Sequence, residues 1–390
     1  MSKRLVICCD GTWNTPDQAD GGRPAPTNVA KVALSVSPSD HGNVEQRVYY
    51  QHGVGVSRWE HIRGGAFGFG LSRNVREAYR FIVENYKSGD ELYFFGFSRG
   101  AFTARSVVGL IRNAGVLRRE NAARIDEAYA LYRDRAVHPN DVESQLFRRS
   151  YSVEPRIRFI GVWDTVGALG IPLSGVPGFK SITRRWAFHD TSLSSIVDAA
   201  YQALAIDEQR RPFEPAIWEP QADSEKQTIE QVWFSGVHSD IGGGYADSGL
   251  SDIALTWMVD RAATNGLEFH PGTITPTPGS IVLSSTSNAR VDPQPMGDLH
   301  NSRTKLYRLL RPVIRGIGQK DPTHEYAGST AVERRDASEC NYAPNGLIDY
   351  LGTPDPQIID VLPPALLEVS LASVMGPPCC HEHGTTWGCG

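Results

Sequence analysis

Three residues of types that cooperate in hydrolysis are spread along the chain, namely Ser98, Asp164 and His238. A histidine can take the proton of a serine hydroxyl during nucleophilic attack and return it to the leaving group. An aspartate beside the imidazole fixes its tautomer and stabilises the imidazolium. Each residue follows a predicted strand, and the carboxyl ends of parallel strands share one edge of a sheet. The sequence therefore predicts a Ser-His-Asp site at that edge.

The surroundings of Ser98 are typical of a nucleophile elbow. An apolar run, 92–95, leads into Gly96-Phe-Ser-Arg-Gly100, and a proline-free segment, 101–113, follows that is compatible with a helix. A serine at such a strand–turn–helix junction has a strained backbone, and glycines flank it because neighbouring Cβ atoms would clash. We expect the hydroxyl of Ser98 to lie above the sheet edge, beside the N-terminus of the helix.

Two backbone segments could bind the oxyanion of a tetrahedral intermediate. One is the turn after the first predicted strand, where Gly11 and Thr12 follow an aspartate. The other is the N–H group of Arg99, the residue after the nucleophile. The glycine would allow the backbone to approach the substrate carbonyl closely.

Other carboxylates leave part of the chemistry open. Asp247 lies close behind His238 in the chain and could orient it in place of Asp164. Asp10 and Asp240 could together hold a cation, which would suit metal-assisted hydrolysis of another bond, such as a phosphodiester. The serine mechanism itself requires no cofactor, and none is expected for it.

Strand-like and helix-like segments alternate along the first two thirds of the chain, which predicts an α/β fold with a mostly parallel, doubly wound sheet. Strands are expected at 4–9, 47–51, 92–97, 156–163 and 231–237. Helices are expected at 28–36 with Thr27 or Asn28 as N-cap, at 72–86 with Ser72 as N-cap, and at 101–113, 121–134, 192–207, 251–264 and 304–314.

One catalytic domain is expected over residues 1–315, followed by an irregular C-terminal extension, 316–390, that packs on it or is partly flexible. Within the domain, residues 170–228 are expected to form a lid-like insertion. Its first part is rich in glycine, proline and serine, and the predicted amphipathic helix at 192–207 would cover the carboxyl edge of the sheet.

Composition excludes few classes of protein. The net charge of −5 gives no electrostatic reason to expect a nucleic acid partner. No apolar run is long enough for a spanning helix, and the N-terminus is typical of a strand and not of a signal peptide. A cytoplasmic location, or delivery by non-classical secretion, is therefore expected.

The cysteines lie in two groups. Cys8 and Cys9 are expected to be reduced and buried, whereas the Cys/His-rich tail, 379–389, matches no common zinc pattern.

Several segments together resemble the α/β-hydrolase domain family that includes the catalytic domains of type VI secretion phospholipase effectors. They are residues 9–14 (CDGTWN), 89–105 (GDELYFFGFSRGAFTAR), 162–167 (VWDTVG), 203–213 (ALAIDEQRRPF) and 237–245 (VHSDIGGGY). The resemblance spans about residues 4–315. It implies an α/β-hydrolase fold in which Ser98, Asp164 and His238 occupy the positions of the family triad, and it implies hydrolysis of lipid or phospholipid esters.

The leading hypothesis is a serine esterase or lipase acting on carboxylic esters, with an acyl lipid or phospholipid as substrate and transient contact with a membrane surface. Two alternatives stay open at this point. One is the metal-assisted hydrolase described above, and the other is a non-catalytic effector or binding module that keeps the fold. The sequence does not indicate an oligomeric state.

Overall fold

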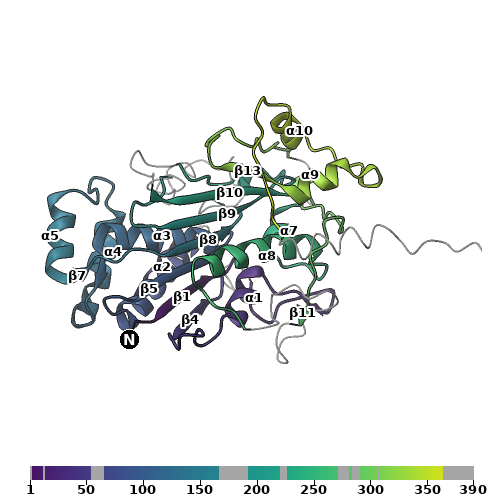
Figure 1. The fold of residues 1–390 in the computed structure, drawn as a ribbon. Coiled ribbons are helices and arrows are strands. Elements are labelled where there is room, and N and C mark those ends of the chain that lie inside the picture. Colours follow the sequence, from purple (N-terminus) through teal and green to yellow (C-terminus); the bar gives the residue numbers. More distant parts are fainter. Residues whose placement is uncertain are drawn as a thin grey trace, which may run out of the picture.

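The computed structural model describes residues 2–11, 14–53, 66–166, 192–219, 226–270, 281–282, 290–304, 307–308 and 310–362. An eight-stranded sheet lies at its centre, with the strand order β14-β13-β10-β9-β8-β5-β1-β4 (Figure 1). Every neighbouring pair in this sheet is parallel. The strands are β1 (Arg4–Cys9), β4 (Gln46–Gln51), β5 (Glu91–Phe97), β8 (Phe159–Trp163), β9 (Ala199–Ala205), β10 (Thr228–Phe234), β13 (Glu325–Gly328) and β14 (Ile358–Ile359).

Successive side chains of the central strands enter two different hydrophobic cores. In β1, Leu5, Ile7 and Cys9 belong to one core, while Val6 and Cys8 belong to the other. This alternation is the period of two of a strand, and both sets are buried because helices cover both faces of the sheet. The five expected strands are all present, and the predicted α/β fold with a mostly parallel sheet is confirmed.

The helices form two outer layers. One core packs α1 (Asn28–Ser35) and α8 (Gly249–Thr264) against the sheet, and the other packs α2 (Ala66–Asn85) and α3 (Arg99–Ala114) against the opposite face. α4 (Ile125–Arg133) and α5 (Val142–Tyr151) lie outside α3 (Figure 1). Smaller elements are α7 (His238–Gly242), the 3₁₀ segments Arg119–Arg124, Arg211–Phe213 and Ser338–Cys340, and the antiparallel pairs β2 (Ala19–Asp20) with β3 (Arg23–Pro24), β6 (Val116–Leu117) with β7 (Ser152–Val153), and β11 (Ile281–Val282) with β12 (Arg290–Val291).

The structure confirms some of the predicted helix caps and helix starts and contradicts others. The hydroxyl of Thr27 caps α1 as expected, because it accepts a hydrogen bond from the N–H of Ala30 at 3.1 Å. Ser72 is not an N-cap, since α2 already begins at Ala66. Its hydroxyl instead accepts a hydrogen bond from the hydroxyl of Tyr129 on α4. The helix expected at 121–134 is a 3₁₀ turn followed by α4.

The helix expected at 192–207 is wrong, because residues 199–205 form strand β9 between β8 and β10. Its sequence, AAYQALA, is buried at every position. Alanine favours helices, and a strand buried on both faces lacks the alternation of apolar and polar residues that identifies a strand. The part of the lid-like insertion that covers 170–191 and 220–225 lies outside the described residues.

The helix expected at 304–314 is contradicted only in its second part. Residues 305–306 and 309 lie outside the described residues, and 307–308 are in a 3₁₀ turn. Residues 310–314 are not helical, and Pro312 cannot continue a hydrogen-bonded turn.

The C-terminal extension contributes regular structure to the central sheet. Further along, β13 pairs with β10 and β14 pairs with β13. α9 (Ser329–Asp336) and α10 (Asn345–Leu351) build a third core over β9 and β10. The described part of the extension, 316–362, is therefore not irregular, and the Cys/His-rich tail lies outside the described residues.

Asp207 connects the extension to the ends of two strands. Its Oδ2 accepts hydrogen bonds from the N–H of Gly236, 2.7 Å away, and from the hydroxyl of Tyr342, 2.8 Å away. Burial raises the pKa of this carboxyl group to about 6, although both hydrogen bonds favour the charged form. The native protein thus keeps a proton here that the unfolded chain, with an ordinary aspartate, releases near pH 4.

This proton makes stability depend on pH in a predictable direction. Because the pKa is higher in the folded state, the contribution is fully present below about pH 4 and is lost as the pH rises through about 6. Asp207→Asn is expected to remove this loss of stability, which amounts to about 1–2 kcal/mol in the free energy of unfolding. Urea unfolding of both proteins at pH 4.5 and pH 7 measures the difference, and the exposed Asp349→Asn is the matched control. Equal pH dependence in wild type and Asp207→Asn would contradict the prediction.

No helix within the described ranges combines the length and the apolar character needed to cross a membrane.

Candidate active site

Ser98 lies at the turn between β5 and α3 in a backbone conformation that is rare for residues other than glycine. Its φ is 57° and its ψ is −118°. The flanking glycines are required by close backbone approach. A Cβ on Gly96 would lie 2.6 Å from Cα of Ala101, and one on Gly100 would overlap the carbonyl oxygen of Cys9. The expected strand–turn–helix junction is therefore present, with a strained serine at its apex.

Substituting Gly100 tests how far this turn depends on the absence of a side chain. Because the added methyl group would meet backbone atoms of β1, Gly100→Ala is expected to destabilise the protein by about 3 kcal/mol. Gly109→Ala is the matched control in the same helix, where the nearest atoms belong to the ring of Tyr132, the closest 3.0 Å away. Urea denaturation measures both, and a Gly100→Ala variant as stable as Gly109→Ala would refute the close-approach explanation.

Asp164 and His238 meet at the carboxyl edge of the sheet. Asp164 directly follows β8, and His238 is the first residue of α7 after β10. Nδ1 of the imidazole lies 2.5 Å from Oδ2 of the carboxylate, and both side chains are buried. Asp164 also has a positive φ, 37°, and this marks a second strained residue at the same edge. The two side chains therefore form a buried, hydrogen-bonded contact at this edge.

A buried arginine binds the same carboxylate. Nη1 of Arg315 donates to Oδ1 of Asp164 at 2.6 Å, and Nη2 donates to Oδ2 at 3.1 Å. The guanidinium also donates to the carbonyl oxygens of Ala205 and Phe213. Burial by itself disfavours the charged carboxylate, but Arg315 and His238 outweigh it and hold the pKa of Asp164 well below its ordinary value. Asp164 is therefore ionised throughout the neutral range.

Aromatic rings pack around the imidazole of His238. The ring of Phe97 lies 4.7 Å from it between centroids, and the ring of Phe213 meets it edge-on at 4.9 Å. The N–H of His238 donates to the buried carboxylate of Glu208 at 3.4 Å. These contacts leave the imidazole in a largely dry environment with a fixed plane. Electrostatic interactions are strengthened in such surroundings.

Ser98 belongs to the same edge as this pair. β5 and β8 are neighbours, and the N–H of Ser98 donates to the carbonyl of Trp163, the residue before Asp164, at 3.0 Å. Phe97, which precedes the serine, packs on His238. Within the described residues, the serine hydroxyl and the imidazole share no hydrogen bond in this structure. Such contacts are often loose before substrate binds, so the catalytic roles stay a prediction.

The three residues expected to form an oxyanion hole differ in their surroundings. The N–H of Gly11 donates to Oδ1 of Asp10 at 2.6 Å, so a substrate oxygen would compete with that carboxylate. Thr12 lies outside the described residues. Arg99 is the first residue of α3, which places the positive end of the helix dipole beside Ser98. The role of these residues in binding an oxyanion stays a prediction.

Asp10 and Asp240, the two carboxylates that could hold a cation, each contact other side chains of the protein. Oδ2 of Asp10 accepts hydrogen bonds of 2.6 Å from the hydroxyls of Thr27 and Tyr50, and burial raises its pKa despite them. Asp240 lies 2.6 Å from Nδ1 of His300. In the part of the chain that the structure describes, no group of three or more His, Cys, Asp or Glu side chains is arranged to hold a metal ion.

Asp247, the alternative acid, is exposed and accepts a hydrogen bond from the N–H of Gly249 at 3.3 Å. The carboxylate that contacts the imidazole of His238 is that of Asp164. The geometry thus favours Asp164 over Asp247 as the partner of His238.

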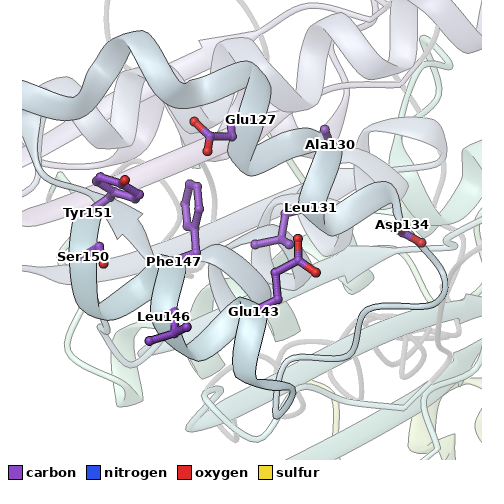
Figure 2. A pocket seen from close by; sticks show the side chains of 9 residues that line it. All are labelled: Glu127, Ala130, Leu131, Asp134, Glu143, Leu146, Phe147, Ser150 and Tyr151. Carbon is purple, nitrogen blue, oxygen red and sulfur yellow. The ribbon is translucent and has the colours of Figure 1, made fainter.

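Two cavities lie on the side of the sheet that α3, α4 and α5 cover. One, of about 450 Å³, lies between α4 and α5, with the rings of Phe147 and Tyr151 among its walls (Figure 2). The other, of about 660 Å³, lies beside α3 and includes Arg105, Arg112 and Trp218 in its wall. The first is remote from α7, as the positions of α5 and α7 in Figure 1 make clear.

Sequence reasoning missed Arg315, Glu208 and Phe213 as residues of the site. Glu208 and Phe213 lie in the segment 203–213, whose resemblance to the family was noted without a role. Their proximity to His238 follows from the position of β9, which was expected to be a helix. Arg315 lies in a loop with no sequence feature that sets it apart from the other arginines of the chain, and only the tertiary fold brings it to Asp164.

Comparison with known proteins gives matches of unequal extent. The family described as "T6SS, Phospholipase effector Tle1-like, catalytic domain" matches residues 3–261. Uncharacterized protein YEL023C of Saccharomyces cerevisiae is 28% identical over 243 residues, which cover 56% of this chain and 33% of the yeast protein. A crystal structure of an uncharacterized protein from Pseudomonas aeruginosa aligns with a TM-score of 0.43 and 20% identity, over 71% of this chain and 48% of that one. The chain thus spans about a third of the length of the yeast protein and about half of the solved one.

Proposed function

The chain belongs to the family of Tle1-like phospholipase effector catalytic domains of type VI secretion, and from this premise we propose that it is a serine hydrolase of carboxylic esters. Its substrates would be acyl lipids or phospholipids, and the fold would be that of an α/β-hydrolase. The observation that carries the proposal is the buried Asp164–His238 pair at the edge where Ser98 occupies a strained turn.

The proposed mechanism assigns one role to each side chain. His238 takes the proton of Ser98 as the serine oxygen attacks the ester carbonyl carbon, and a tetrahedral intermediate forms. Asp164 stabilises the imidazolium, which then protonates the leaving alcohol. Water attacks the acyl-enzyme by the same route, releases the carboxylic acid and regenerates Ser98. The ionised state of Asp164 at neutral pH supports its part in this sequence.

The oxyanion of each tetrahedral intermediate would lie beside the first turn of α3, with Arg99 N–H as one donor and the Gly11–Thr12 turn as the second. Loss of one such donor typically reduces the stabilisation of the transition state by about 3 kcal/mol. The helix dipole of α3 favours negative charge at this place. These assignments extend the proposal to residues whose contacts with a substrate await measurement.

A panel of substrates tests the proposal. p-Nitrophenyl esters of increasing acyl length, and phospholipid vesicles analysed for released fatty acid, are to be incubated with the protein in the presence and absence of EDTA. We expect ester hydrolysis that is insensitive to EDTA, and a preference for long acyl chains would identify a lipase. Hydrolysis of bis-p-nitrophenyl phosphate that EDTA abolishes, with no ester hydrolysis, would contradict the proposal and favour a metal-assisted phosphodiesterase.

A further inference from the structure

Arg315 lies in a loop, yet only 5% of the residue is exposed. Its guanidinium makes four hydrogen bonds, two to the carboxylate of Asp164 and one each to the carbonyl oxygens of Ala205 and Phe213. A planar guanidinium that binds both oxygens of a carboxylate restricts its rotation as well as neutralising it. The orientation of Asp164 toward His238 is thus fixed from two sides.

The loop that carries Arg315 is anchored at both ends. The N–H of Val313 donates to the carbonyl of Gln209 at 3.0 Å, next to the buried Glu208. Two residues after the arginine, Ile317 enters the third core with Leu347 and Tyr350 of α10. Arg315 therefore connects the C-terminal extension to the acid of the proposed triad. It does so from outside residues 3–261, the part of the chain that matches the family.

Charged groups approach His238 from several elements, and the balance among them decides how strongly its protonated form is stabilised. Asp164 touches the imidazole, and Arg315 shares that carboxylate from the far side. A carboxylate that already binds an arginine through both oxygens offers less stabilisation to an imidazolium than a carboxylate that is unpaired. Among the described residues, Glu208 accepts a hydrogen bond from the N–H of His238 and is paired with Arg210. Asp240, two positions after His238, is paired with His300.

We propose that Arg315 is a positioning residue of this site, which orients Asp164 and shares its charge so that His238 remains the neutral base to lower pH than Asp164 alone would allow. The catalytic meaning of this inference rests on the proposed function, whereas the effect on the imidazole does not. In this arrangement the loop that leads into the extension supplies a cation to the acid of the proposed triad.

The sign of the effect follows from the charges. When Arg315 is replaced by methionine, the full charge of Asp164 acts on His238 and favours the imidazolium. The NMR titration curve of His238 is then expected to lie at higher pH than in the wild type. The acidic limb of kcat/KM should move in the same direction. Arg315→Lys keeps the positive charge and loses the two-point contact, so its midpoint should stay close to that of the wild type while kcat falls.

The decisive measurement is an NMR titration of ¹⁵N-histidine-labelled protein, with the His238 signals assigned by their loss in His238→Gln. Wild type, Arg315→Met and Arg315→Lys are compared with Arg334→Met as control. Arg334 is a buried arginine of the C-terminal extension that binds the carbonyl oxygens of Pro295 and Gly297. A shift in Arg315→Met that is absent in Arg315→Lys and Arg334→Met supports the inference, and an unchanged midpoint in folded Arg315→Met overturns it.

The design separates this inference from the proposed function and from a purely structural role. The NMR titration needs no activity, so a protein that hydrolyses no ester would refute the proposed function and leave the effect of Arg315 measurable. A purely structural role would lower stability without moving the midpoint. If Arg315→Met does not fold, Arg315→Lys decides. A midpoint near that of the wild type together with reduced kcat supports the inference, whereas unchanged kcat or a midpoint moved to higher pH overturns it.

Discussion

Ser98→Ala is expected to reduce ester hydrolysis by at least about 10⁴-fold, because the nucleophile that forms the acyl-enzyme is absent. KM should change little, since only the hydroxyl is removed and the surrounding pocket stays. The alanine also relieves no backbone strain, because φ at this position remains positive. Initial rates with a p-nitrophenyl ester over a range of concentrations measure both parameters.

Ser106→Ala is the matched control for this variant. Ser106 is buried in the same helix, two turns beyond Ser98, and it has no part in the proposed mechanism. Its activity is expected to stay within a few-fold of the wild type. Ester hydrolysis that survives in Ser98→Ala at near wild-type rate, with the protein folded, would show that another group is the nucleophile.

Asp164→Asn is expected to have the second largest effect, a loss of about 10⁴-fold in kcat. The amide has nearly the same shape as the carboxylate, but it cannot stabilise the imidazolium and can favour the wrong tautomer of His238. It also leaves the charge of Arg315 buried without its partner, and removing one member of a buried pair typically costs about 3–5 kcal/mol of stability. Circular dichroism and thermal melting accompany the rate measurement for this reason.

Asp247→Asn is the control for the choice of acid. Asp247 is exposed and makes its hydrogen bond to Gly249, so its substitution should leave kcat nearly unchanged. If Asp164→Asn fails to fold, the double variant Asp164→Asn/Arg315→Met removes both buried charges and isolates the loss of the acid. A large loss of activity in Asp247→Asn, together with an active Asp164 variant, would exchange the roles of the two aspartates.

Much of the sheet could be predicted from the sequence because strands such as β1, β5 and β8 are nearly continuous apolar runs. The edge where Ser98, Asp164 and His238 lie followed from the same pattern. Ser98 and Asp164 directly follow such a run, and His238 lies a short turn after the apolar end of β10. β9 could not be recognised, because AAYQALA has no alternation and its alanines favour a helix in isolation. Tertiary packing between β8 and β10 overrides that local preference.

The surroundings of the acid depend on long-range contacts that no local pattern records. Arg315 lies 151 positions after Asp164 in the chain, and its loop is placed by the packing of Ile317 against α10. The same holds for Phe213, which reaches His238 only because β9 lies next to β10 in the sheet. The contact between Asp164 and His238 could thus be predicted from the sequence, whereas the groups that surround it required the fold.

The C-terminal region is part of the central fold. Removal of the extension, 316–390, would take two strands from the central sheet and expose β10. It would also remove Ile317, whose packing against α10 places the loop that carries Arg315 at Asp164. The boundary proposed at residue 315 therefore falls at a residue that contacts the site itself. Experiments on this domain should therefore keep the residues that follow position 315.

The central claim, that Ser98 is an activated nucleophile, is tested most directly by a fluorophosphonate probe and mass spectrometry. The probe phosphorus forms a bond to an activated serine oxygen and releases fluoride, so it reports the nucleophile whatever the natural substrate is. We predict a single adduct that maps to Ser98, is absent in Ser98→Ala and forms far more slowly in His238→Ala. No adduct on the folded wild-type protein, or one that maps to another residue and persists in Ser98→Ala, would contradict the account.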